Sequence, residues 1–206
     1  MTTPRLVIWE GLDAWRAEVA RVELGDGELS ATGTQLGVEP LPYRLDYALE
    51  ALDGFVTRSM RVEVTGESWA RGLVLSHDGH GDWRCETEED GTPDLPPPGG
   101  EVSALGDARD VDLGLSPLTN FMPLRRAALH EGPGATDLLA AWISVPDLGL
   151  HASRQRYEHV RLGPHGAVVR YLDAGAHAGF TSELEVDGDG LVRLYPGLAR
   201  RADGPR

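Results

Sequence analysis

The chain of 206 residues contains a single cysteine, no lysine and no long apolar run. Cys85 has no second cysteine with which to form an internal disulfide, and this usage fits a reducing compartment. No stretch approaches the roughly 18 consecutive apolar residues of a membrane-spanning helix. The first apolar run, residues 6–9, ends at Glu10 and is too short for the apolar part of a secretory signal. We therefore expect a cytoplasmic protein with no stable membrane insertion.

Positive charge is also scarce. The 19 basic residues are all arginine and stand against 33 acidic ones, which gives a formal net charge of −14. Nucleic acids and anionic membranes attract proteins that present a positive surface. We therefore expect no nucleic-acid partner. The exclusive use of arginine is typical of GC-rich coding and does not by itself indicate bidentate recognition at each position.

Turn-forming residues are abundant by contrast. The 26 glycines and 14 prolines exceed the roughly 25 residues of these two types that average usage predicts for this length. Between them, segments such as residues 43–49 and 180–186 alternate apolar and polar side chains, which is typical of half-buried strands. We count about ten such segments, from residues 16–23 and 28–36 to residues 191–195. The motifs "GDGE" and "DGDG" suit tight hairpin turns, so the sequence predicts a mainly β fold.

Helical signals are few. Ser116 and Pro117 are typical of an N-cap and a first helical position, but Pro123 limits such a helix to a turn or two. A second short helical turn is predicted over residues 137–141.

The strand patterns continue on both sides of one long loop. Residues 87–101 form an acidic stretch rich in proline and glycine, and residues 201–206 are expected to fray as a tail. We therefore expect a single domain over residues 1–200.

Three short motifs resemble functional sites but fit turns better. Residues 185–190 match the first half of a calcium loop, yet Pro196 stands where the bidentate glutamate is needed. His77 and His80 lie in a glycine-containing turn with no distant partners to complete a zinc shell. Ser68 in "GESWA" lacks the final glycine of a nucleophile elbow and the helix that should follow. We therefore predict no metal and no cofactor.

The stretch "DVDLGLSPLTNFMPLRR", residues 110–126, mixes acids and arginines with large apolar side chains. In an extended segment Asp110 and Asp112 share one face, and apolar residues form the other. The remainder divides into apolar bulk for burial, Leu118, Phe121, Met122 and Leu124, and polar groups that need partners at a core boundary, Thr119, Asn120, Arg125 and Arg126. From the residues alone this stretch is a buried plug with internal Asp–Arg pairs, the floor of a binding site, or a catalytic site.

Four blocks of sequence together resemble the putative glycolipid-binding family of bacteria. In chain order they are the "HDGHGDW" hairpin, "DVDLGLSPLTNFMPLRR", "SVPDLGLHASRQRYEHV" and "VDGDGLVRLYPGLARR", which together span residues 77–201. The family pattern has Thr-Asn followed by Leu-Pro-Ile-Arg-Arg, which Thr119 to Arg126 match closely. The long proline-rich loop before Asp110 departs from the pattern.

This resemblance implies a fold similar to prokaryotic lipoprotein carriers. Such a fold is a large antiparallel sheet bent into a half-barrel or corner and filled by a few short helices, so the proline-bounded segment with Leu118, Phe121 and Met122 is expected to fill the trough. Known carriers are exported and this sequence shows no export signal, so the carrier role does not follow from the fold.

The function that we expect is non-enzymatic binding of an amphipathic small molecule, a glycolipid or another lipid, in the concave face of the sheet. The candidate ligand-binding residues are Asp110, Asp112, Thr119, Asn120, Arg125, Arg126, Gln155 and Tyr157. We expect one of the two adjacent arginines to be structural and the other to face the ligand. Two alternatives stay open: an enzyme for a small acyl or glycosyl substrate with Asp110 and Asp112 as acid and base, and a protein-interaction module.

Overall fold

A computed structural model describes residues 4–175 and 179–203, and within these residues fourteen strands form one sheet. The first seven strands are β1 (Arg5–Gly11), β2 (Arg16–Leu24), β3 (Leu29–Gly37), β4 (Tyr43–Leu52), β5 (Val56–Thr65), β6 (Ala70–His77) and β7 (Trp83–Asp90). The other seven are β8 (Asp110–Leu113), β9 (Ala135–Ile143), β10 (Leu150–Gly163), β11 (Gly166–Asp173), β12 (Thr181–Asp187), β13 (Val192–Tyr195) and β14 (Ala199–Arg201). Three short helices complete the described chain: η1 (Val102–Leu105), η2 (Leu118–Asn120) and α1 (Phe121–Arg126).

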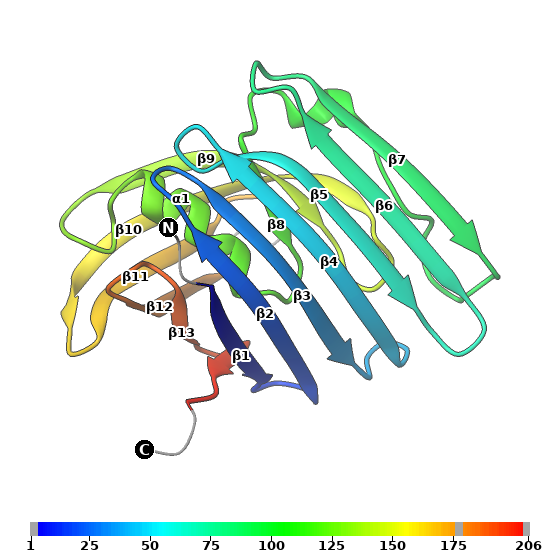
Figure 1. Cartoon of the computed structure of the whole chain (residues 1–206), viewed down its shortest axis with the longest axis horizontal. Coiled ribbons are helices and arrows are strands. Elements are labelled where there is room, and N and C mark those ends of the chain that lie inside the picture. Colours follow the sequence, from blue (N-terminus) through cyan, green and yellow to red (C-terminus); the bar gives the residue numbers. More distant parts are fainter. Residues whose placement is uncertain (1–3, 176–178, 204–206) are drawn as a thin grey trace.

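The sheet runs in the order β7-β6-β5-β4-β3-β2-β1-β14-β13-β12-β11-β10-β9-β8. Neighbours pair antiparallel except β8 and β9, which are parallel. The edges β7 and β8 are not paired with each other, so the sheet stays open. Figure 1 shows its two halves curving around α1, with β2 to β5 on one side and β10 to β13 on the other. The predicted large antiparallel sheet filled by short helices is confirmed.

Alternation along the strands sets which face is buried. In β4 every second side chain from Tyr43 to Ala51 is buried, as the sequence pattern predicted. Two glycines of β3 leave room for the aromatic rings of this row. A Cβ built at Gly33 would lie 2.4 Å from the Tyr47 ring, and one at Gly37 would lie 2.5 Å from the Tyr43 ring. The tyrosine rings therefore lie across the β3 backbone.

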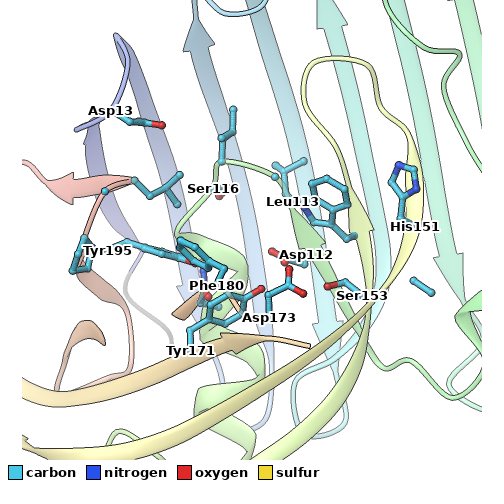
Figure 2. Close-up of a pocket in the computed structure, with 18 residues that line it drawn as sticks. Asp13, Asp112, Leu113, Ser116, His151, Ser153, Tyr171, Asp173, Phe180 and Tyr195 are labelled. Carbon is cyan, nitrogen blue, oxygen red and sulfur yellow. The ribbon is translucent and has the colours of Figure 1, made fainter. Parts of the chain in front are cut away.

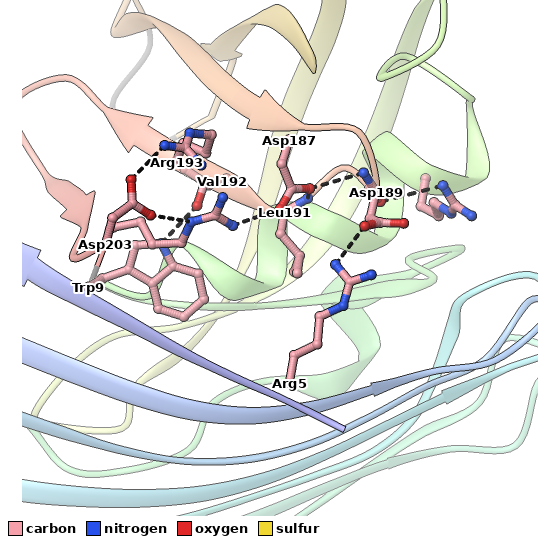
Figure 3. A network of polar contacts seen from close by, with 10 residues as sticks. Arg5, Trp9, Asp187, Asp189, Leu191, Val192, Arg193 and Asp203 are labelled. Carbon is pink, nitrogen blue, oxygen red and sulfur yellow. Dashed lines mark hydrogen bonds and ion pairs between the residues drawn. The ribbon is translucent and has the colours of Figure 1, made fainter. Parts of the chain in front are cut away.

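The two ends of the described chain meet where β1 pairs with β14. The Trp9 indole donates to the Val192 carbonyl (2.9 Å), and Arg5 forms an ion pair with Asp189 (2.6 Å; Figure 3). In the same turn, one Asp187 oxygen accepts the backbone N–H groups of residues 189 and 191, while the other contacts Arg201 (2.7 Å). The hairpin turn predicted for the "DGDG" motif, residues 187–190, is confirmed. Asp187 stabilises the turn itself, and Asp189 pairs with Arg5.

Three local predictions, one of a helical turn and two of segment boundaries, are wrong. The helical turn predicted over residues 137–141 lies within β9, because pairing with β8 and β10 outweighs the helix propensity of leucine and alanine. The long loop begins only after Asp90, since residues 87–90 pair with β6. Arg201 belongs to β14 and does not fray. The end of the predicted tail, residues 204–206, lies outside the described residues.

The segment from β8 to α1 fills the space between the two halves of the sheet, as expected. Leu118, Phe121 and Met122 are at most 1% exposed. Thr57 of β5 secures this plug on the opposite half, because its N–H donates to the residue 109 carbonyl (2.9 Å) and its hydroxyl accepts from the residue 111 N–H (3.0 Å). Pro123 stands in the first turn of α1, where an N–H has no intrahelical partner to lose. No helix of the described residues is long and apolar enough to span a membrane.

An ion pair between a partly exposed arginine and a buried carboxylate closes the plug on itself. Arg126, at the end of α1, donates to both carboxylate oxygens of Asp110, at the start of β8, with one distance of 2.9 Å, and also to the Phe55 carbonyl (3.0 Å). The Asp110 side chain is 2% exposed. Burial raises the pKa of this carboxyl, although the Arg126 guanidinium opposes the shift.

Arg126→Ala should lower the free energy of unfolding by about 3 kcal/mol, because removing the guanidinium leaves the buried Asp110 carboxylate without its counter-charge. Urea denaturation measures this loss. Arg125→Ala is the matched control and should cost about 1 kcal/mol or less. Equal losses in the two variants would contradict this role of Arg126.

Candidate functional site

A cavity of about 380 Å³ lies beside the plug, where the turn between β8 and η2 meets β9, β10, β11 and the turn between β13 and β14 (Figure 2). Its aromatic lining consists of Trp142, Tyr171, Phe180 and Tyr195. Its polar lining includes Asp13, Asp112, Asp173, Asn120, His151 and Ser153. Among the described residues, no arginine lines this cavity. The site is therefore aromatic and acidic.

Asp112 is held by a chain of hydrogen bonds behind the cavity wall. The Thr119 hydroxyl donates to one carboxylate oxygen (2.9 Å) and the Gln155 amide donates to the other (2.7 Å). The Tyr157 hydroxyl in turn donates to the Asn120 carbonyl oxygen (2.9 Å) and lies 3.3 Å from that of Gln155. These contacts fix both Asp112 and Asn120, which face the cavity.

Burial raises the pKa values of several groups at the cavity wall. Burial raises the pKa of Asp112 to about 6, and the neighbouring carboxylates Asp110 and Asp173 add to the shift. Figure 2 shows the Asp112 and Asp173 side chains next to each other at the cavity floor. Burial and these carboxylates also raise the pKa values of Tyr171 and Tyr195, so both phenols stay protonated. The cavity thus offers hydroxyl donors and carboxylate acceptors.

The predicted site residues separate into three groups. Asp112 and Asn120 line the cavity. Thr119, Gln155 and Tyr157 lie directly behind them and position them. The remaining three, Asp110, Arg125 and Arg126, are not part of the lining.

The two arginines point to other partners. Arg126 is bound to Asp110, which places it in the structural role expected for one of the pair. Arg125 contacts the His130 imidazole and lies 3.5 Å from the Asp189 carbonyl, on the β12–β13 turn. The structure therefore brings neither guanidinium to this cavity.

Sequence reasoning missed most of the aromatic and acidic lining. Trp142 of β9 and Tyr171 and Asp173 of β11 come from two strands whose alternation indicates burial but not which inward side chains border an empty space. Tyr195 lies in one of the four blocks that carry the family resemblance. That block was the only available signal for this wall.

A family model described as "Putative glycolipid-binding" matches residues 6–201. The chain belongs to this family. Among solved structures, a crystal structure of a DUF1089 family protein from Pseudomonas aeruginosa is similar, with 28% sequence identity and a TM-score of 0.67 over 90% of this chain and 92% of that chain. The search among curated proteins gave no match. The resemblance to the glycolipid-binding family is thus confirmed, while the likeness to lipoprotein carriers stays a prediction.

In this member of the glycolipid-binding family, a second buried carboxyl lies behind the cavity. Ser116, which lines the cavity, donates its hydroxyl proton to Glu18 Oε1 (2.7 Å), and so does Tyr47 (2.7 Å). Glu18 Oε2 has no hydrogen-bond partner among the described residues. Burial raises the pKa of Glu18 to about 7. Burial alternates along β2, so that Glu18 points inward with Ala20 and Val22, but the sequence gives no sign that a carboxyl is buried there.

Glu18→Gln should remove a loss of stability that the native protein suffers as pH rises. Because the folded pKa of about 7 exceeds the ordinary 4.5, the folded state binds the proton more tightly, and stability falls between pH 4.5 and 7. Unfolding free energies of the two proteins should agree near pH 4, and the variant should be more stable by about 3 kcal/mol at pH 8. Parallel curves over this range would contradict the assignment.

Proposed function

We propose that the protein binds an uncharged, hydroxylated amphiphile, a glycolipid or a related glycoside, with its sugar in the cavity beside the plug. The observation that carries this proposal is the composition of the lining, aromatic walls around carboxylates without an arginine. The proposal is non-enzymatic binding, in agreement with the family description.

The cavity has the size and chemistry of a small-molecule site. Ligand pockets commonly enclose about 300 to 1,000 Å³ and combine an apolar lining with a few placed polar groups. Tyr171 and Tyr195 offer ring faces to the apolar face of a sugar, and Asp112 and Asp173 accept hydrogen bonds from hydroxyl groups. Carboxylate acceptors form stronger hydrogen bonds than neutral ones.

Charge selects against anionic head groups. Asp112 and Asp173 contribute acidic groups to the lining, Asp13 is paired with Arg16, and the whole chain carries a formal net charge of −14. A phosphate or carboxylate ligand would enter a field of its own sign. Neutral sugars avoid this cost.

The two alternative functions have less support. Hydrolysis by Asp110 and Asp112 needs both carboxyl groups at the substrate, and Asp110 is bound to Arg126 outside the lining. Strand addition by a partner would use the edge β7, where Glu86, Glu88 and Glu89 are exposed. Charged edge strands resist such pairing.

A neutral alkyl glycoside should bind, and an alkyl phosphate of the same chain length should bind at least about tenfold more weakly, a difference of roughly 1.4 kcal/mol. Isothermal titration calorimetry below the micelle concentration measures both affinities. Tighter binding of the phosphate would contradict the proposed head group.

Asp173→Asn should weaken glycoside binding about tenfold, because an amide accepts a hydroxyl hydrogen bond less strongly than a carboxylate does. Asp137→Asn is the matched control, since Asp137 is an exposed acid of β9 that does not line the cavity. Thermal denaturation verifies that both variants are folded. Equal affinities of the two variants would contradict a direct role of Asp173.

A further inference from the structure

A second cavity, of about 470 Å³, adjoins the first. It lies between the β1–β2 turn and the β3–β4 turn, and Leu115 and Val145 form part of its wall. Asp13 and Leu115 line both cavities. The two cavities are therefore neighbours that share these two residues as a common wall.

Two exposed apolar side chains line this second cavity, together with the charged residues Arg16 and Glu39. Of the nine large hydrophobic residues exposed in the described chain, four stand on the two hairpins, namely Leu12, Trp15, Leu36 and Val38. Arg16 pairs with Gly37 across β2 and β3, so Trp15 and Val38 lie across from each other at the ends of these strands. They are 64% and 43% exposed and both line the cavity. Single exposed apolar residues are ordinary, but a group of them around a hollow is typical of a ligand-binding groove.

The junction between the cavities is held in place by polar contacts. Arg16, whose side chain is 7% exposed, forms an ion pair with Asp13 (2.8 Å) and donates to the Leu198 carbonyl (2.9 Å). The Leu12 N–H donates to the same carbonyl (3.0 Å). These bonds tie the β1–β2 turn to the β13–β14 turn, which borders the first cavity. The wall that the two cavities share is therefore held in place by these bonds.

We propose that the second cavity is a subsite for the alkyl chain of the same amphiphile whose head group occupies the first. This inference rests on the proposed function. A ligand that crosses the junction at Asp13 and Leu115 keeps its hydroxyl groups beside the carboxylates and places its first methylene groups against Trp15, Val38 and Pro40. An alkyl chain is the occupant that fits, because the second cavity adjoins the polar site and is bordered by the apolar side chains of Trp15, Val38 and Pro40.

The affinity of the native protein should rise with alkyl chain length by up to about fourfold for each methylene buried. Calorimetry with methyl, hexyl, octyl and decyl glycosides of one sugar, all below their micelle concentrations, measures this slope. In Trp15→Glu the slope should be nearly flat, while the affinity for the methyl glycoside stays as in the native protein. Leu162→Glu is the matched control, because Leu162 is 65% exposed and lines neither cavity, and its slope should equal the native one.

The same titrations separate this inference from the proposed function. If methyl and decyl glycosides bind the native protein equally, the chain subsite is refuted and the sugar site stands. If the matching alkanols bind with a slope that Trp15→Glu removes, but no glycoside binds better than its alkanol, the subsite stands and the sugar site is refuted. A native dimer in sedimentation that Trp15→Glu converts to monomers would show that a second copy covers the groove, and would also overturn the inference.

Discussion

The ion pair between Asp110 and Arg126 joins the first residue of the plug to the last. Between these two residues the chain passes from β8 through η2 to α1, and its apolar side chains fill the space that the curved sheet encloses. A sheet bent in this way has two apolar inner faces that need a filling, and the plug supplies it from a single segment. Because the plug fills only part of the trough, a hollow is left at the turn between β8 and η2.

Two costly carboxyl groups lie at that turn, Asp112 in the lining of the hollow and Glu18 behind it. Thr119 donates a hydrogen bond to Asp112, and Ser116 donates one to Glu18. Burial raises the pKa values of both. Apolar residues at these positions would avoid the desolvation cost. Stability is thus given up beside the cavity, a pattern typical of functional sites.

The sheet and the plug could be predicted from local sequence, and the cavity could not. Alternation in segments such as β4 specifies the inward face directly. Pro117 and Pro123 mark the short helical part of the plug. Residues 137–141 misled because leucine and alanine also favour helices, and only pairing with β10 decides their conformation. From the sequence we expect Arg125 to lie in an extended segment. It lies instead in α1, where its side chain contacts His130 and the Asp189 carbonyl and not the cavity. The cavity beside Tyr171 is left where side chains of strands distant in sequence do not fill the space between them. Local sequence patterns contain no signal for such a space.

The central claim is that the acidic and aromatic cavity receives an uncharged sugar. A crystal structure of the protein with a neutral alkyl glycoside tests it most directly. We expect the sugar ring to lie against Tyr171 and Tyr195, with its hydroxyl groups within hydrogen-bond distance of Asp112 or Asp173. A sugar bound elsewhere on the molecule, with this cavity holding only water, would contradict it.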